Sequence, residues 1–404
     1  MSRSITLCAA VLVLFAVGSI TTAKSPTVII KVDGASAKPD VDQKPPFRGK
    51  RPTVDVAILL DTSNSMDGLI NQAKSQLWTI VQKFATAKKH GQTPMLRVAL
   101  FEYGNMSLPA SEGYIRQVVP LTDDLDKLSE ALFGLTTNGG DEYCGQVIDV
   151  AVKSLDWSKE PNGYKAIFIA GNEPFTQGSV DYRSACKQAI ERGIVVNTIH
   201  CGNSSEGVDG KWQDGAKLAE GESFNIDQDR AVVQIHCPQD EIIIRLNTEL
   251  NKTYLWYGAE SDRRFYSENQ VAQDSNAGGM GGGVLAARAA AKATSSYSNR
   301  NRDLVDTLSE DKEILRRVKA EELPEPLQKM TTPEREAYVK DMAAKRASVQ
   351  QQIAELSKER EAYLAKEQMR LADKSGDATL GDAVVVAIQK QLADSGFEQS
   401  DAAE

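Results

Sequence analysis

The chain has 404 residues, a formal net charge of −9 at pH 7 and five cysteines. A mildly acidic chain is a poor candidate for binding nucleic acid or anionic membranes, because both carry negative charge themselves. The length is more than twice that of a typical domain of roughly 150 residues, so we expect more than one domain.

Residues 1–23 have the pattern of an export signal peptide. Arg3 precedes an apolar run, and small residues ending at Ala23 form a cleavage site. The run is short for a membrane span of roughly 20 residues, and no later segment is apolar enough to be one. Cys8 follows Leu7 instead of a small residue, which disfavours lipid attachment. We therefore expect an exported protein, periplasmic or secreted, without a membrane span once the signal is removed.

Residues 52–257 alternate between short apolar runs and amphipathic stretches, after a polar, proline-containing leader over residues 24–51 that we expect to be flexible. Strands are predicted at residues 54–60, 96–103, 116–121, 165–170, 195–201 and 231–237, and helices at 70–88, 125–132, 145–155, 183–192 and 241–251. This alternation predicts an α/β, Rossmann-like fold with an open, mostly parallel sheet and helices on both faces. In such folds ligands bind at the carboxyl ends of the strands.

The rest of the chain is predicted to be mainly helical. Residues 258–302 are rich in Gly and Ala, which indicates a linker or a segment that wraps against the α/β domain. Residues 303–374 have the pattern of a helical hairpin or short coiled coil. Residues 375–404 are expected to form a short helix at 382–392 and a polar tail.

The apolar seam of this helical region contains two arginines, Arg346 and Arg360. Its other members follow alternating spacings of three and four residues: Val339, Met342, Val349, Ile353, Leu356 and Tyr363. Two uses of the seam stay open. It can join copies of the chain into a homo-oligomer, or it can fold back on its own α/β domain.

A candidate metal site follows the first predicted strand, in the stretch VAILLDTSNSM. Asp61, Ser63 and Ser65 lie at alternate positions, and a loop that curls away from a strand can bring them to one point. One carboxylate and two hydroxyls suit a hard cation such as Mg²⁺. The alternative is that these side chains only cap the following helix. The position at the end of a buried strand favours the metal site.

The stretch VDVAILLDTSNSM resembles the first metal-site motif of von Willebrand factor type A domains, and the likeness extends over residues 52–257. The resemblance implies a metal-ion-dependent adhesion site built from three loops. The first loop matches at Asp61, Ser63 and Ser65.

The other two loops depart from the family pattern. In the second loop, TTNGGDEYCG, Asp141 stands at what looks like the position of the family's threonine, with Thr137 upstream as a weaker candidate. The third loop has Gly171 where the family usually has Asp, and Glu173 is a weaker replacement. We expect Asp141 to compensate for the missing acid, since this keeps two carboxylates near the ion. The alternative is a degenerate site without metal.

The resemblance also implies a function. We expect a non-enzymatic, adhesion-type binding protein whose Mg²⁺, or alternatively Mn²⁺ or Ca²⁺, accepts an acidic side chain from a protein partner. The alternative is a metal-free scaffold or oligomerising platform that acts through its helical region.

Four cysteines follow the signal peptide, and an even number in an exported protein favours disulfides. They are Cys144, Cys186, Cys201 and Cys237, which allow three pairings. Cys144 and Cys186 lie in the helices after the second and third loops, and Cys201 and Cys237 would end neighbouring strands in the resembled fold. We therefore predict Cys144–Cys186 and Cys201–Cys237.

Two other uses of these thiols compete with disulfides. Cys144 begins a predicted helix, so it could serve as the nucleophile of a cysteine-dependent enzyme with His200 or His236 as base. The tripeptide Ile-His-Cys occurs at residues 199–201 and 235–237 and could form a zinc site. Neighbouring residues on a strand point to opposite faces, which disfavours the zinc site.

Overall fold

A six-stranded sheet forms the core of the α/β domain in the computed structural model, which describes residues 51–399 except 231, 233 and 373–378. The predicted signal peptide and all of the leader except Arg51 lie outside the described residues. The strand order is β4-β3-β1-β5-β6-β7, and only β4 is antiparallel to its neighbour. The strands are β1 (Thr53–Asp61), β3 (Met95–Tyr103), β4 (Ile115–Thr122), β5 (Tyr164–Gly171), β6 (Val195–Cys201) and β7 (Ser223–Ile226). The predicted α/β fold is confirmed.

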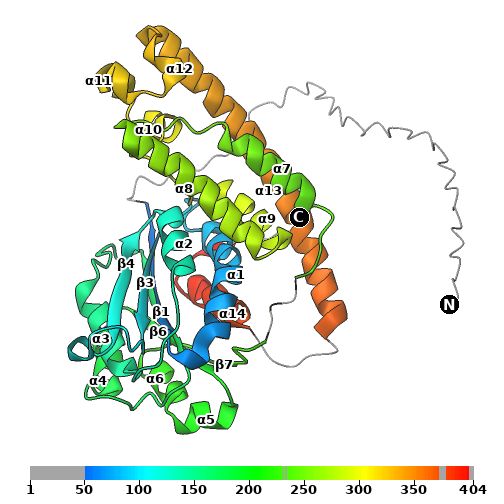
Figure 1. Ribbon diagram of the computed structural model, residues 1–404. Helices are drawn as coiled ribbons and strands as arrows, with labels where there is room; N and C mark the ends of the chain where they lie inside the picture. The colour runs from blue at the N-terminus through cyan, green and yellow to red at the C-terminus, as the bar shows by residue number, and fades with distance from the viewer. Residues whose placement is uncertain (1–50, 231, 233, 373–378, 400–404) are drawn as a thin grey trace, which may run out of the picture. The chain divides into compact units, whose positions relative to one another are not determined.

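Helices cover both faces of the sheet (Figure 1). One face packs against α1 (Asp67–Ala85), α2 (Leu125–Phe133) and α14 (Leu380–Asp394). The other face packs against α3 (Cys144–Ser154), α4 (Tyr182–Glu191) and α6 (Trp212–Leu218), and the short α5 (Ser204–Asp209) precedes α6. Because β1 is central, its side chains alternate between two buried layers, with Val56 on the α1 side and Leu59 on the α3 side.

The prediction of a strand at residues 231–237 is wrong. The edge strand is instead β7, and the described residues of the 231–237 segment form no strand. Gln72 of α1 holds the chain just after β7, since its amide Nε2 donates to three backbone carbonyls, those of Asp227, Gln228 and Arg230. These bonds direct the chain along α1, away from the sheet edge.

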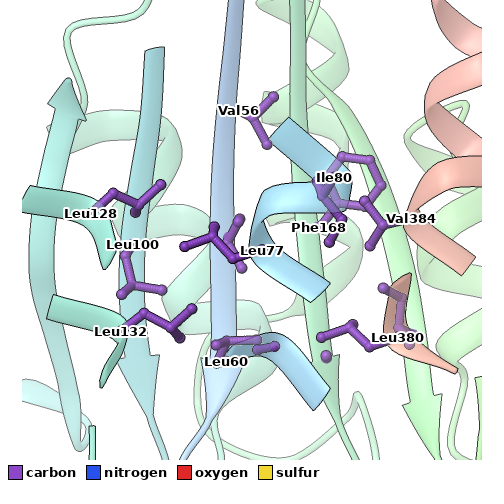
Figure 2. A pocket seen from close by; sticks show the side chains of 14 residues that line it. Val56, Leu60, Leu77, Ile80, Leu100, Leu128, Leu132, Phe168, Leu380 and Val384 are labelled. Atoms are coloured by element: carbon purple, nitrogen blue, oxygen red, sulfur yellow. The ribbon is translucent and has the colours of Figure 1, made fainter. Parts of the chain in front are cut away.

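The last helix, α14, completes the α/β domain although more than 150 residues separate it from β7. The Gln76 side chain accepts from the Gly381 backbone N–H at 2.6 Å and donates to Thr379 at 2.7 Å. A cavity of about 30 Å³, lined by apolar side chains, lies between the sheet and these helices. Figure 2 shows Leu380 and Val384 of α14 near Phe168 on one side of it. The described part of the chain then ends in β8 (Glu398–Gln399), which pairs with β2 (Ala87–Lys88).

Of the two alternatives for residues 258–302, a linker or a segment that wraps against the α/β domain, the packing favours the wrapping segment. These residues contain α8 (Glu260–Gly279) and α9 (Gly282–Lys292), and α9 packs against α1, α8 and α7 (Asp240–Asn251). The alanines of α9 are almost fully buried, because their small side chains let three helices approach α9 closely.

A buried cluster of charges fixes α8 and α9 to the α/β domain. Arg288 of α9 is fully buried and pairs with Asp126 of α2 at 2.8 Å and with Asp274 of α8 at 2.5 Å. Lys292 also pairs with Asp274, at 3.2 Å, and the Arg288 guanidinium lies over the Trp78 ring of α1. Buried charges need partners of this kind, since desolvating an unpaired charge is costly.

Residues 303–372 form no hairpin or coiled coil of their own. Short helices α10 (Leu304–Glu310), α11 (Ile314–Arg317) and α12 (Glu325–Gln328) precede one long helix, α13 (Thr332–Ala372), which packs on α7, α9, α10 and α11. The two seam arginines explain this fold-back. Arg346 pairs with Asp303 at 2.7 Å, and Arg360 pairs with Asp240 at 2.6 Å. Even α13 is too polar to cross a bilayer, and no helix in the described part of the chain meets the length and hydropathy that this requires.

Candidate metal site at the carboxyl edge of the sheet

The first loop places Asp61 at the end of β1, with its side chain buried. One carboxylate oxygen, Oδ1, accepts the backbone N–H of Ser63 at 2.7 Å. The other, Oδ2, is buried and has no hydrogen-bond partner. The hydroxyls of Ser63 and Ser65 lie 3.3 Å apart. The three side chains therefore converge, as the sequence motif predicts, and neither serine side chain caps the helical turn or α1.

The second loop brings Glu142, and not Asp141, to Asp61. Glu142 is 5% exposed, and both its side chain and that of Asp61 lie against Gly104. A Cβ at Gly104 would stand 2.6 Å from Glu142 Cγ and 2.9 Å from Asp61 Oδ1, so this position needs glycine, and its φ of +79° favours glycine too. Asp141 is exposed and accepts a hydrogen bond from the Tyr143 hydroxyl at 3.0 Å.

The third loop contributes an amide in place of the family's acid. Asn172 donates from Nδ2 to the Ser65 hydroxyl at 3.2 Å, while its Oδ1 is buried without a partner. Gly171 leaves no room for a side chain, because a Cβ there would lie 2.4 Å from the Tyr103 hydroxyl and 3.1 Å from Asp61 Oδ2. The Tyr103 hydroxyl, which donates to Ala170 O at 2.9 Å, thus occupies the space of the missing acid.

Buried groups behind the third loop hold its backbone in place. His200 Nε2 lies 3.2 Å from the Asn172 carbonyl, and Trp212 Nε1 donates to the Glu173 carbonyl at 2.9 Å. The Phe175 backbone N–H donates to Gly210 O at 2.8 Å. Burial lowers the pKa of His200, so the imidazole is neutral and can donate from Nε2 at pH 7.

The two weaker candidates for metal ligands, Thr137 and Glu173, differ in their surroundings. Thr137 donates to Asp67 at the start of α1, so its hydroxyl is engaged there. Glu173 is half-buried and acts on the site through its charge, raising the pKa of both Asp61 and Glu142.

The two buried carboxyls have strongly raised pKa values. Burial raises the pKa of Asp61 to about 6, although Ser63 and, more weakly, the nearby Asn172 backbone N–H act in the opposite direction. Burial and the charges of Asp61, Glu173 and Asp141 together raise the pKa of Glu142 to about 8. No positive side chain is among the main causes for either group, so the site contains an excess of negative charge.

These residues fit a hard divalent cation. Asp61 Oδ2 and Asn172 Oδ1 are buried oxygens without partners, and such groups are costly unless something satisfies them. Asp61, Glu142, Ser63, Ser65 and Asn172 offer oxygen only, which suits Mg²⁺, Mn²⁺ or Ca²⁺. Across the described residues, no three His, Cys, Asp or Glu side chains are grouped to hold an ion, so hydroxyl, amide and water oxygens must complete the shell.

Sequence reasoning missed Glu142 and Asn172. Asp141 and Glu142 are adjacent in a loop, and the sequence does not show which of the two side chains points into the site. Asn172 stands directly after the unexpected glycine of the third loop. This amide, next to the position of the missing carboxylate, was the signal in the sequence that could have identified Asn172.

The four described cysteines are free, so both predicted disulfides are wrong. Cys237 lies before α7 instead of ending a strand beside Cys201, because the strand at 231–237 does not form. Cys144 and Cys186 lie in the packed helices α3 and α4, where each thiol is fully buried among apolar side chains.

The hypotheses of a catalytic cysteine and of a zinc site also lack support. Burial raises the pKa of Cys144 well above its usual value, and its sulfur is inaccessible, whereas a nucleophile must be exposed and ionised. His236 is exposed and His200 is buried behind the third loop, so they do not join the cysteines in a zinc site.

The family model described as von Willebrand factor type A domain matches residues 55–214. Among solved structures, the chain is similar to the conserved hypothetical protein BatB from Bacteroides thetaiotaomicron, with 17% identity and a TM-score of 0.33 over 55% of this chain and 99% of that one. It is also similar to the SpRpn10 VWA domain, with 17% identity and a TM-score of 0.35 over 44% and 90% of the two chains.

A third similar structure is that of proximal thread matrix protein 1 from the mussel byssus with a zinc-occupied MIDAS motif. Its identity is 16% and its TM-score 0.35, over 45% of this chain and only 43% of the mussel chain. The search of curated proteins found no match. The sequence match and the observed sheet together show that residues 55–214 belong to the von Willebrand factor type A domain family.

Proposed function

We propose that this protein is an exported, non-enzymatic, adhesion-type binding protein that recognises a protein partner through a divalent metal ion at Asp61. The observation that carries the proposal is the buried, unpartnered Oδ2 of Asp61 at the carboxyl edge of a von Willebrand factor type A sheet. Such domains mediate protein–protein contacts and often bind a divalent metal. Export is proposed from the signal-like pattern of residues 1–23.

The residues named above would hold the ion in distinct roles. Asp61 and Glu142 supply the negative charge, and Ser63, Ser65 and Asn172 supply neutral oxygens. A bound ion would polarise a further oxygen ligand and leave a coordination position for a partner, such as an acidic side chain. The exposed position of Ser65 at the mouth of the site supports access from solvent.

The scaffold alternative has less support from the packing. The seam expected to join copies of the chain is used internally, since Arg346 and Arg360 pair with acids of the same chain. An oligomer formed through that seam would have to break both pairs.

The test combines metal binding with partner binding. Calorimetric titration of Mg²⁺ and Mn²⁺ into the purified protein should show one site, and Asp61→Ala should abolish it. Cross-linking to candidate partners should then depend on the metal in the wild type and disappear with EDTA or with Asp61→Ala. The proposal fails if the wild type binds neither ion at millimolar concentration, or if partners bind equally well in EDTA.

A further inference from the structure

The loops around the candidate metal site carry a strong excess of acids. At the carboxyl edge of the sheet, the described residues of these loops and of the helix starts beside them include eleven acids against three basic residues, Arg183, Lys211 and Arg230, and Arg183 pairs with Asp181 at 3.9 Å. The acids are Asp61, Asp67, Glu112, Asp141, Glu142, Glu173, Asp181, Glu206, Asp209, Asp227 and Asp229. Most of them are exposed, so they face whatever binds this edge.

A bound divalent ion does not reverse this charge. Ionised Asp61 and Glu142 together neutralise one such ion, and Glu173 and Asp141 lie close enough to Glu142 to raise its pKa. Asp229 lies beside the start of α1, where its Oδ1 would be 3.1 Å from a Cβ at Gly68. With the ion bound, the carboxyl edge of the sheet therefore stays negative. It repels a partner whose acidic side chains have no basic side chains beside them.

Two observations besides the charge mark this edge as a contact surface. The Oδ2 of Asp61 is buried without a hydrogen-bond partner, and a buried carboxylate oxygen needs a cation or a donor. Met106, in the loop after β3, is 63% exposed, and Val208 of α5 is 51% exposed. Exposed apolar side chains of this kind are typical of protein interfaces.

We infer that the partner presents a basic protein segment, in which Lys or Arg side chains surround the oxygen that reaches the metal. This inference rests on the proposed function and adds the chemistry of the partner to it. The basic side chains would pair with the exposed acids of the edge, and apolar groups between them would meet Met106 and Val208. Such complementarity mainly speeds association and selects partners.

The test uses a random peptide library displayed on phage and selected against the full protein in Mg²⁺. Selected peptides should be enriched in Lys and Arg, and their binding should weaken as NaCl is raised, because exposed charges are screened over about 10 Å at 0.1 M salt. Peptides without this enrichment, peptides enriched in Asp and Glu, or a failure to select any peptide would overturn the inference.

Two triple variants with the same change in net charge locate the effect. The edge variant carries Glu206→Gln, Asp209→Asn and Asp229→Asn, and the control carries Asp156→Asn, Glu191→Gln and Glu220→Gln at the opposite edge of the sheet. The edge variant should bind the selected peptides about fivefold more weakly or worse, and the control should bind like the wild type. Equal effects of the two variants would overturn the inference. Binding that persists in EDTA would instead overturn the proposed metal function.

Discussion

Asp61 and Glu142, which are 81 residues apart in the sequence, reach the same point from two loops, and both side chains lie against Gly104. The charge of Asp61 raises the pKa of Glu142, so without a cation the two carboxyls are not both ionised at pH 7. A divalent ion would relieve this repulsion. In the proposed site, Asp61 keeps the family's first-loop position and Glu142 supplies the second acid, which the family usually takes from the third loop.

The first prediction separates Glu142 from its neighbour Asp141. Glu142→Gln should weaken Mg²⁺ binding at least tenfold, because it removes one of two buried charges near the ion, whereas Asp141→Asn should change it less than threefold. Calorimetry on both variants checks this, with thermal unfolding as the control for folding. The reverse order of effects would restore Asp141 as the second acid.

The second prediction concerns pH. The metal binds the ionised carboxylates, and the pKa of Glu142 is about 8 and that of Asp61 about 6 in the free site. Affinity should therefore rise with pH, about tenfold per pH unit between the two pKa values, as the ion displaces the proton of Glu142. Titrations in buffers with different ionisation enthalpies count the released protons. In Glu142→Gln the slope over this range should largely vanish.

The third prediction tests why the third loop has glycine. Gly171→Ala should destabilise the protein by about 1–3 kcal/mol, because its Cβ would collide with the Tyr103 hydroxyl. Tyr103→Phe removes that oxygen at the cost of one hydrogen bond, and in that background Gly171→Ala should cost less. Urea unfolding of the double-mutant cycle measures the coupling. Strict additivity would show that Tyr103 does not exclude the side chain.

The fourth prediction concerns the attachment of α13. Arg346 is 5% exposed and pairs with Asp303, and its guanidinium lies 4.1 Å from the centre of the Tyr254 ring. Arg346→Met should lower the free energy of unfolding by about 3–5 kcal/mol, because it leaves the buried Asp303 unpaired. Arg370→Met, on the same helix but exposed, is the matched control and should cost less than about 1 kcal/mol. Chemical denaturation compares the two.

The fifth prediction concerns the thiols. In the folded protein, Cys144, Cys186, Cys201 and Cys237 should react slowly with a thiol reagent, because all four are buried and burial raises the pKa of each. After unfolding without reductant, all four should react at once. Mass mapping that finds a Cys144–Cys186 or Cys201–Cys237 bridge would contradict the structure.

The sequence predicted the parts of the fold that depend on local pattern. The buried strand before Asp61 and the helix after it are visible because continuous apolar runs and periodic stretches have different spacings. Residues 231–237 looked like another strand for the same reason, but hydrogen bonds from Gln72 to the residues just before them hold the chain beside α1. Such side-chain contacts between distant residues leave no local signal.

Two other gaps in the sequence-based prediction share one cause. The sequence could not decide whether residues 258–302 are a linker or a segment that wraps against the α/β domain, because the burial of the small side chains of α9 depends on contacts with α1, α7 and α8. Glu142 was missed because the direction of a loop side chain depends on the surrounding backbone, here Gly104. Sequence spacing alone could identify Asp61, Ser63 and Ser65. It could not show which side chains of the second and third loops point toward them.

The place of α14 has a consequence for how the chain is made. Its residues Leu380, Val384 and Ile388 belong to the same apolar core as the first strand, so the two ends of the described chain close one domain. Domains generally fold as units while the ribosome synthesises them from the N-terminus. Here the α/β core lacks one wall until α14 has been synthesised, so the core cannot complete its packing before helices α8 to α13 have also been made. A nascent chain stopped before Leu380 should therefore remain sensitive to protease.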